Sequence, residues 1–539
     1  MAKDGSRERP NILVIMSDTH TAAATGCYGS EVARTPNLDR LAAEGVVFER
    51  AYCQNPLCVP SRQSLITGLR SYQTGVIHND MPMPAMRTIA HILKESGYDT
   101  AAIGKMHFIP DTECSQGKER HFGFDRRVDY EEFYWYLRRE RGVAPLDGQP
   151  DDPWRIVHLE RQLSAMQVPL AAPDGPMRDG RYRAGTMAFE NHQEALVLRE
   201  WRAFLEERKG ESGEGKTATQ VPAQSRTRTR TRTNVGTETG TNEKPFLAFV
   251  SFRTPHPPLL PPPEFWEPFK AAAIPLPPAP DENATGNPFL GVRGKGAPDE
   301  ERLRYLRHYH AFASFTDHCV GEALRALDGA GLANDTLVVY ASDHGDMLHE
   351  HGMTGKMVFY ENSVRVPLII RWPGRVAGGW RYEGLVELLD LFPTLLEAAG
   401  AQATDLAAKE GRFAEGRFAE GRSLLPDLLA RHGAGKEFVF SECYPMERNR
   451  RRFGDWPHRM VRTRDWKFIQ YGPAREDLFG LIGDPGETRN RIGDAACGEP
   501  VCAGAAETLR KALDECLGPL PQPEERLLSG YYDETAGKT

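Results

Sequence analysis

The stretch Asn11-Ile12-Leu13-Val14-Ile15-Met16-Ser17-Asp18 contains an unbroken apolar run that stops at a serine and an aspartate. Such a run is typical of a strand buried on both faces of a parallel sheet, because a half-exposed strand would alternate apolar and polar residues. In open α/β sheets, ligands bind outside the carboxyl ends of the strands. Asp18 therefore stands where a functional carboxylate is expected, although turns and helix caps use the same residue type.

Three later stretches repeat this form and also stop at polar residues. They span residues 98–103, 246–252 and 336–341, and a helical pattern over residues 300–327 precedes the last of them. Strands alternating with helices favour an α/β fold with a mostly parallel central sheet flanked by helices. The polar residues that follow the three strands are Lys105 with His107, His256, and Asp343 with His344. Because parallel strands end at the same edge, we expect these side chains and Asp18 to form one site.

The segment Cys58-Val59-Pro60-Ser61-Arg62 places a thiol, a rigid turn, a hydroxyl and a permanent cation close together. Proline is common in the first turn of a helix, so Cys58 is expected near a helix N-terminus, whose unpaired amides favour an anion. Arg62 adds a planar cation suited to an oxyanion with several oxygens. A cysteine here is either a buried structural residue or a nucleophile, and the residues at the strand ends favour the nucleophile.

Composition narrows the classes of function. The chain has 539 residues, which predicts one large and one smaller domain. Its formal net charge of -8 argues against a nucleic-acid partner, for which a basic domain is expected. No stretch is long and apolar enough to span a membrane, and residues 1–10 are too polar for a signal peptide, so we expect a cytoplasmic protein without a membrane partner. The nine cysteines are then expected to be mostly reduced thiols.

The segment that begins at Cys58 resembles the signature of the type I sulfatases in the alkaline phosphatase superfamily. That signature is Cys-x-Pro-Ser-Arg followed by a short run to Thr-Gly, here Thr67-Gly68. The strand-end sequences Gly104-Lys105-Met106-His107 and Ser342-Asp343-His344-Gly345-Asp346 are similar to two further motifs of the family. Lys105 and His107 alternate, so on an extended strand end both would point to the same side. The resemblance implies the alkaline-phosphatase-like α/β fold.

The resemblance also implies the chemistry of the site. In the family, a formylglycine-generating enzyme oxidises the cysteine to formylglycine, whose hydrated form attacks a sulfate ester next to one divalent metal ion, here Ca²⁺ or Mn²⁺. It implies that the metal ligands are Asp18, residue 58, Asp343 and His344. It implies that the catalytic residues are Cys58, Arg62, Lys105, His107, His256 and Lys356. Asn79 lies where some relatives place a substrate-binding residue, although an ordinary loop would serve as well.

Two positions depart from the commonest sulfatase pattern. Thr19 replaces a second aspartate, and His344 stands where many members have asparagine. The single aspartate is similar to relatives that cleave choline sulfate or phosphonate monoesters, and the imidazole widens the range of suitable metals from calcium toward manganese or zinc. We therefore expect a sulfatase that cleaves a small-molecule sulfate monoester to an alcohol and sulfate. The alternatives are a phosphonate monoester or phosphodiester hydrolase with the same nucleophile, and a silent protein that binds sulfated ligands.

The domain boundary is expected near residue 430. Residues 1–430 would form the catalytic domain, and residues 431–539 a small α+β domain with antiparallel strands and a final helix. Residues 209–244 are rich in Gly, Thr, Ser, Glu and Arg and predict a disordered insertion in the catalytic domain. The sequence does not identify the alcohol, and it neither requires nor excludes a homo-oligomer.

Overall fold

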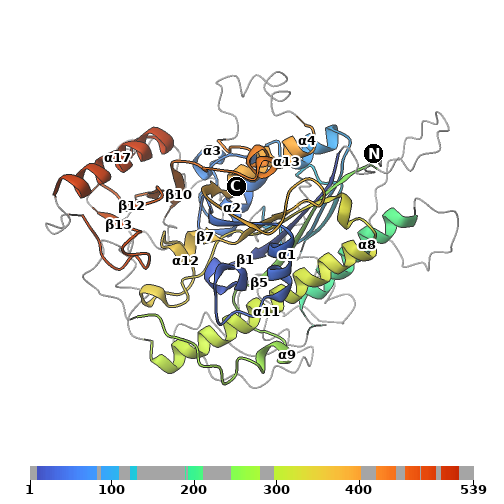
Figure 1. Ribbon diagram of the computed structural model, residues 1–539, viewed down its shortest axis with the longest axis horizontal. Helices are drawn as coiled ribbons and strands as arrows, with labels where there is room; N and C mark the ends of the chain where they lie inside the picture. The colour runs from blue at the N-terminus through green and yellow to red at the C-terminus, as the bar shows by residue number, and fades with distance from the viewer. Residues whose placement is uncertain are drawn as a thin grey trace, which may run out of the picture.

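A central sheet with helices on both faces forms the larger part of the molecule (Figure 1). The computed structural model describes residues 9–79, 81, 86–108, 122–129, 189, 192–210, 244–278, 297–401, 420–444, 456–473, 475–492 and 499–520. Its nine-stranded sheet has the order β4-β3-β5-β1-β6-β8-β2-β7, and β9 pairs with β2. The strands are β1 Asn11–Asp18, β2 Val46–Tyr52, β3 Asp99–Gly104, β4 Arg126–Asp129, β5 Phe246–Pro255, β6 Thr336–Ser342, β7 Arg365–Val366, β8 Leu368–Arg371 and β9 Trp380–Glu387.

Strand β1 lies at the centre of this sheet, parallel to β5 on one side and to β6 on the other. Strands β3 and β4 continue the parallel half beyond β5, whereas β8 and β7 run antiparallel to their neighbours. Every residue of β1 is buried, as its unbroken apolar run predicts. The mostly parallel α/β fold is thereby confirmed.

Side chains of β1 alternate between two hydrophobic cores. Ile12, Val14 and Met16 pack in the core beneath helices α2 Cys58–Thr67, α4 Ile89–Glu95 and α13 Leu391–Ala398. Leu13 and Ile15 pack on the opposite face, beneath α1 Pro36–Glu44, α8 Gln193–Gly210 and α11 Asp299–Gly329. This two-sided burial holds the carboxyl ends of the strands in fixed positions.

The C-terminal part forms a smaller antiparallel sheet of strand order β10-β11-β12-β13. Its elements are β10 Val439–Cys443, β11 His458–Arg462, β12 Trp466–Gln470, β13 Glu476–Gly480 and helix α17 Glu499–Leu517. Leu509 and Leu513 of α17 pack on Val461 and Phe468 of the sheet, which gives this domain its own core. The antiparallel strands and the final helix match the expectation, and the boundary at residue 430 stays a prediction.

Several local predictions need correction or lie outside the described residues. Residues 209 and 210 belong to helix α8 and not to an insertion, and the rest of the expected disordered insertion lies outside the described part of the chain, apart from residue 244. The proline-rich stretch after His256 contains the short helix α9 Pro263–Trp266. Among the described helices, none is long and apolar enough to cross a membrane. Of the seven cysteines in the described ranges, six are free thiols and Cys502 is disulfide-bonded.

Candidate active site

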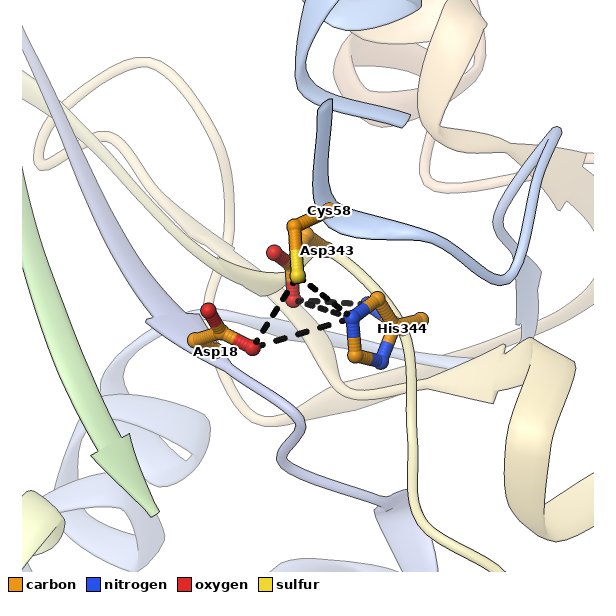
Figure 2. Close-up of side chains that lie close together, drawn as sticks. All are labelled: Asp18, Cys58, Asp343 and His344. Carbon is orange, nitrogen blue, oxygen red and sulfur yellow. Dashed lines mark hydrogen bonds and ion pairs between the residues drawn. The ribbon is translucent and has the colours of Figure 1, made fainter. Parts of the chain in front are cut away.

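The strand ends bring the predicted residues to one edge of the sheet, as Figure 2 shows for four of them. Asp18 is the last residue of β1, and Asp343 and His344 directly follow β6. Cys58 is the first residue of α2, so its predicted place at a helix N-terminus is confirmed. The register of β1 against β5 shifts between Met16 and Asp18, an irregularity of the kind that redirects a side chain at a strand end.

Four side chains place atoms that can bind a metal ion close together. One ligand atom each from Asp18, Cys58, Asp343 and His344 lies within 4.8 Å of the others, and all four residues are buried. The Nε2 atom of His344 lies 3.3 Å from Sγ of Cys58, 3.6 Å from Oδ1 of Asp18 and 3.7 Å from Oδ1 of Asp343. This convergence of two carboxylates, an imidazole and a sulfur is of the kind that holds a metal ion.

The tautomer of His344 fits this role. Its Nδ1 atom lies 3.0 Å from the carbonyl oxygen of Gly345 and donates to it when the ring is neutral. The lone pair of Nε2 then faces the carboxylates, which is the usual arrangement of a histidine that binds a metal. A Cβ on Gly345 would lie 1.9 Å from the carbonyl oxygen of Asn362, so only glycine fits after His344.

Two lysines add positive charge to the same group. Lys356 Nζ lies 2.8 Å from Cys58 Sγ and 2.9 Å from His344 Nε2, and Lys105 Nζ forms an ion pair with Asp18. Burial raises the pKa of the Cys58 thiol, but Lys105, Lys356 and His344 outweigh this and bring the pKa well below its usual value. The site therefore stabilises negative charge at residue 58.

Burial and Cys58 raise the pKa of Asp18, yet the lysines and His256 hold it well below its ordinary value. Burial lowers the pKa of Lys356, whereas Cys58 and the two aspartates raise it above its ordinary value. Asp18 is therefore a carboxylate and Lys356 an ammonium at neutral pH.

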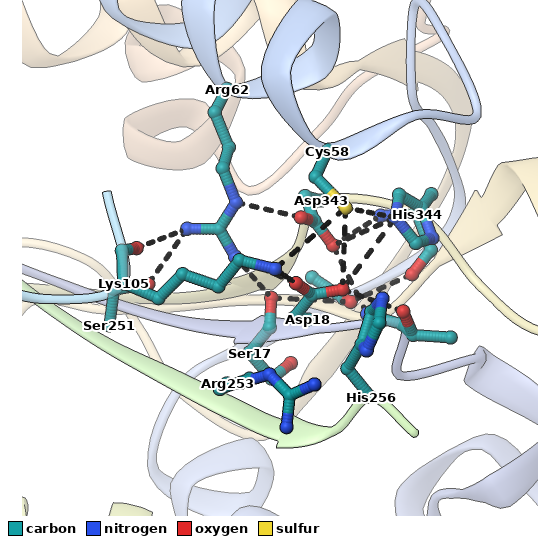
Figure 3. Close-up of polar contacts among 12 residues, drawn as sticks. Ser17, Asp18, Cys58, Arg62, Lys105, Ser251, Arg253, His256, Asp343 and His344 are labelled. Carbon is teal, nitrogen blue, oxygen red and sulfur yellow. Dashed lines mark hydrogen bonds and ion pairs between the residues drawn. The ribbon is translucent and has the colours of Figure 1, made fainter. Parts of the chain in front are cut away.

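Arg62 lies in the site, but the N–H groups of its guanidinium donate to other protein residues (Figure 3). Its Nε donates to Oδ2 of Asp343 at 2.7 Å, and Nη1 donates to the carbonyl oxygen of Lys105 at 2.6 Å and to Oγ of Ser251 at 2.8 Å. Nη2 contacts the carbonyl oxygen of Ser17 at 3.4 Å. The guanidinium thus ties together α2 and the ends of β1, β3, β5 and β6, which differs from the sulfate contact expected of it.

His107 and His256 come from different strand ends, and both side chains interact with Cys58. A hydrogen bond from His107 helps to lower the pKa of Cys58. A hydrogen bond between Cys58 and His256 raises the pKa of His256, against the larger effect of burial. The expected strand alternation of Lys105 and His107 is wrong in detail, because β3 ends at Gly104 and His107 has a φ of 51°. Gly104 itself has a φ of 98°, and a Cβ there would lie 2.0 Å from the carbonyl oxygen of Ser251.

Burial lowers the pKa of His256 to about 4. Its Nδ1 lies 2.6 Å from the carbonyl oxygen of Pro257 and donates to it in the neutral ring. The Oδ1 of Asn79 accepts a hydrogen bond of 3.1 Å from the backbone N–H of Val59, next to Cys58, and the expected substrate contact of Asn79 stays a prediction. Asn79 therefore caps the helix that begins at Cys58.

Thr19 has a function that sequence reasoning missed. Its hydroxyl donates to Oδ1 of Asp18 at 2.6 Å, and its backbone N–H donates to Oδ1 of Asp343 at 3.1 Å. The residue has a φ of 66°, a rare conformation for a β-branched side chain. Thr19 thus holds the carboxylates of Asp18 and Asp343, at a position where the commonest pattern has a further aspartate. The departure from that pattern at residue 19 was the sequence signal that could have indicated this contact.

Comparison with known proteins assigns the family. The sulfatase family model matches residues 10–401, which include all the residues of the site. The chain belongs to the sulfatase family. A second model, described as the C-terminal part of N-sulphoglucosamine sulphohydrolase, matches residues 349–515 of this sulfatase.

Relatives of this sulfatase act on different groups. It is 27% identical to an arylsulfatase of Clostridium perfringens, with 97% of this chain and 98% of that protein covered. It is 28% identical to a choline-sulfatase of Rhizobium meliloti, with 89% and 82% covered. A solved phosphonate monoester hydrolase of Agrobacterium radiobacter has the same fold, with a TM-score of 0.68, 24% identity and coverage of 93% and 95%. The expected resemblance to the choline-sulfatase and phosphonate hydrolase branch is confirmed.

Proposed function

We propose that this sulfatase cleaves a sulfate monoester of a small molecule to an alcohol and inorganic sulfate, with residue 58 as the nucleophile. The observation that supports this most directly is the convergence of Lys356 and Lys105 on residue 58 at a buried carboxylate and imidazole group. A tetrahedral sulfate carries negative charge on several oxygens, and buried ammonium groups are suited to hold them. The arylsulfatase and choline-sulfatase relatives support the same reaction class.

Residue 58 would react only after modification. Converted to formylglycine by a transient encounter with a formylglycine-generating enzyme, it supplies a hydrated aldehyde as the attacking group, and a divalent ion supplies charge that favours its ionisation. Asp18, Asp343 and His344 would hold that ion together with residue 58. The mixture of carboxylate and imidazole donors suits Mn²⁺ as well as Ca²⁺.

The remaining side chains orient the substrate and carry protons. Lys105 and Lys356 would bind the sulfate oxygens as charge develops on them, and Arg62 would keep Asp343 in place without touching the substrate. His256 would give a proton to the departing alcohol oxygen. Its pKa of about 4 belongs to the protein without substrate, and a sulfate anion beside the ring would raise it. His107, next to residue 58, would take the second proton of the hydrated aldehyde as sulfate leaves.

A phosphonate monoester or phosphodiester is the second candidate substrate. His344 and Thr19 favour it, because both differ from the commonest sulfatase pattern. His344 is one of the four possible metal ligands, and Thr19 donates a hydrogen bond to another, Asp18. The likeness in fold to a phosphonate monoester hydrolase supports the same alternative. A sulfate monoester, a phosphonate monoester and a phosphodiester each carry one negative charge, so the cations around residue 58 suit all three and turnover has to distinguish them.

The test is a comparison of kcat/KM for an aryl sulfate and for the matching aryl phosphonate monoester. The enzyme should be produced together with a formylglycine-generating enzyme and loaded with Mn²⁺ or Ca²⁺. Faster turnover of the sulfate supports the proposal, and faster turnover of the phosphonate favours the alternative. Binding of both compounds without any turnover by confirmed formylglycine protein would instead indicate a silent binding protein. Cell fractionation and light scattering test the expected cytoplasmic location and the oligomeric state.

A further inference from the structure

The segment that carries Lys356 is attached to the C-terminal domain by a buried lysine on strand β12. Lys467 is fully buried, and its Nζ donates to the carbonyl oxygen of Phe359 at 2.9 Å. The same ammonium lies 2.7 Å from Oε1 of Glu361 and 2.6 Å from Oε1 of Glu487. One side chain of the C-terminal domain thus binds the backbone three residues after Lys356 and a carboxylate five residues after it.

Glu361 is the second fixed point of this attachment. Its backbone N–H donates to Oε2 of Glu487 at 2.7 Å, and its carboxylate accepts from Tyr52 at 2.9 Å and from Nε of Arg462 at 3.3 Å. Burial raises the pKa of Glu361, but Lys467 and the neighbouring arginines bring it far below its ordinary value, so the group is a carboxylate. Glu361 therefore joins β2 of the large sheet to the C-terminal domain.

Tyr360, between these two points, is packed by its ring. It stacks on His351 with a centroid distance of 3.9 Å and an interplanar angle of 20°, and it also lies against Phe479 of β13 with a centroid distance of 6.0 Å. Residues 359, 360 and 361 therefore each contact a residue of the C-terminal domain. On its other side, Lys356 is preceded by Gly355, whose N–H donates to Oδ2 of Asp346 at 3.1 Å and whose carbonyl oxygen accepts from Met347 at 2.9 Å.

Lys356 thus lies in a short bridge between two anchors. The anchor before it belongs to the loop after β6, which also carries Asp343 and His344. The anchor after it depends on Lys467. Met357, directly after Lys356, has a φ of 77°, a conformation that a residue with a side chain keeps only when its surroundings hold it.

We propose that Lys467 is a positioning residue for Lys356, and that the C-terminal domain thereby takes part in catalysis by holding this lysine against residue 58. This inference rests on the proposed function of Lys356. Removal of the ammonium of Lys467 would leave Glu361 and Glu487 buried side by side, with the donor to the Phe359 carbonyl lost. Burial raises the pKa of Glu487 to about 7 even beside Lys467, so without that ammonium Glu487 would take up a proton. The segment with Lys356 would then lose its ammonium contacts at residues 359 and 361 and would move away from residue 58.

The experiment is a double-mutant cycle between Lys356→Met and Lys467→Met in formylglycine protein loaded with metal, with 4-nitrophenyl sulfate as substrate. If Lys467 acts through Lys356, Lys467→Met lowers kcat/KM by about tenfold or more in the native background and by less than about twofold in the Lys356→Met background. The loss should fall mainly on kcat. Losses that multiply in the two backgrounds would overturn the proposal, as would native kcat/KM in Lys467→Met.

Arg459→Met provides the matched control. Arg459 is a buried cation on β11 of the same sheet, but its partners Gln470, Asp514 and Gly518 all lie within the C-terminal domain. Its loss should lower the melting temperature and leave kcat/KM within about twofold of native. Glu361→Gln is the milder second variant should Lys467→Met fail to fold, because Lys467 keeps Glu487 and the Phe359 carbonyl; its loss must also disappear in the Lys356→Met background.

A second readout separates this proposal from the proposed function. Amide hydrogen exchange over residues 353–361, measured by mass spectrometry, should become faster in Lys467→Met and stay native in Arg459→Met. Unchanged exchange in Lys467→Met would overturn the positioning function. If exchange is faster in Lys467→Met but Lys356→Met has native activity, Lys467 still positions the segment. The result would then contradict the sulfate-binding function of Lys356.

Discussion

The ammonium of Lys356 lies 2.8 Å from the sulfur of Cys58, although 298 positions separate the two residues in the chain. This contact brings together the helix that starts at Cys58 and the loop that follows β6. It places positive charge at the atom where the proposed nucleophile is made. The predictions below test the parts of the protein that create and use this contact.

Cys58→Ala should abolish turnover and leave the fold intact. The alanine removes the only side chain that formylglycine could come from, whereas the core around α2 loses a single sulfur atom. We expect kcat/KM for an aryl sulfate to fall by at least about a thousandfold, as for the loss of other catalytic nucleophiles. Circular dichroism should match that of the native protein. Retained turnover in this variant would refute the assignment of residue 58.

Arg62→Met should damage stability and activity together. The guanidinium is buried and pairs with Asp343 at 2.7 Å, so its removal leaves a buried carboxylate without its partner. We expect the free energy of unfolding to fall by about 3 kcal/mol. Because Arg62 is proposed to touch no substrate, the remaining folded enzyme should show a lower kcat and a nearly native KM. A large rise in KM would instead indicate direct contact with the sulfate.

Removal of the metal should destabilise the protein, because Asp18 and Asp343 would then lie buried with less compensating charge. Dialysis against a chelator should lower the melting temperature, and Mn²⁺ or Ca²⁺ should restore it in proportion to binding. In His344→Asn, which exchanges imidazole for an oxygen ligand, the ratio of Ca²⁺ to Mn²⁺ affinity should rise by about tenfold. An unchanged ratio, measured by calorimetry, would count against His344 as a ligand.

Glu442 makes stability depend on pH away from the site. Burial raises its pKa to about 7, and its carboxyl oxygens bind the backbone N–H of Tyr72 and the hydroxyl of Tyr444 at 3.0 Å each. Its folded pKa exceeds the unfolded value, so this contribution to stability is complete below about pH 4.5 and is lost as pH rises to about 7.

The isosteric variant Glu442→Gln removes this titration. The difference in unfolding free energy between the variant and the native protein should be measured at both pH values. We expect it to be about 1 to 3 kcal/mol more favourable to the variant at pH 8 than at pH 4.5. Urea unfolding at the two pH values measures the difference. An equal effect of the substitution at both pH values would contradict the raised pKa.

The sequence predicted those parts of the site that sit at the ends of apolar strands. Asp18, His256 and Asp343 follow runs whose burial leaves little choice of structure, so their shared edge could be inferred. Strand β2 was missed because Glu49 and Arg50 interrupt its apolar pattern in the middle. The short helix α9 was also missed, because prolines surround it and the sequence shows no helical spacing of apolar residues there.

Contacts between distant side chains could not be inferred from local patterns. Arg62 was expected to bind sulfate, yet its donors contact Asp343 and the strand ends, a geometry fixed only when α2 packs on the sheet. The hydrogen bond by which Asn79 caps α2 was not foreseen either. Thr19 looked like a missing ligand and proved to hold Asp18 and Asp343 in place.

The central claim is that residue 58 becomes the nucleophile of a sulfatase. Mass spectrometry of the proteolytic peptide that contains residue 58, from protein produced with a formylglycine-generating enzyme, tests it most directly. We predict an aldehyde at residue 58, in a fraction of the molecules that rises in step with kcat for an aryl sulfate. A peptide that carries only the thiol, from protein that nevertheless turns over the sulfate, would contradict the account.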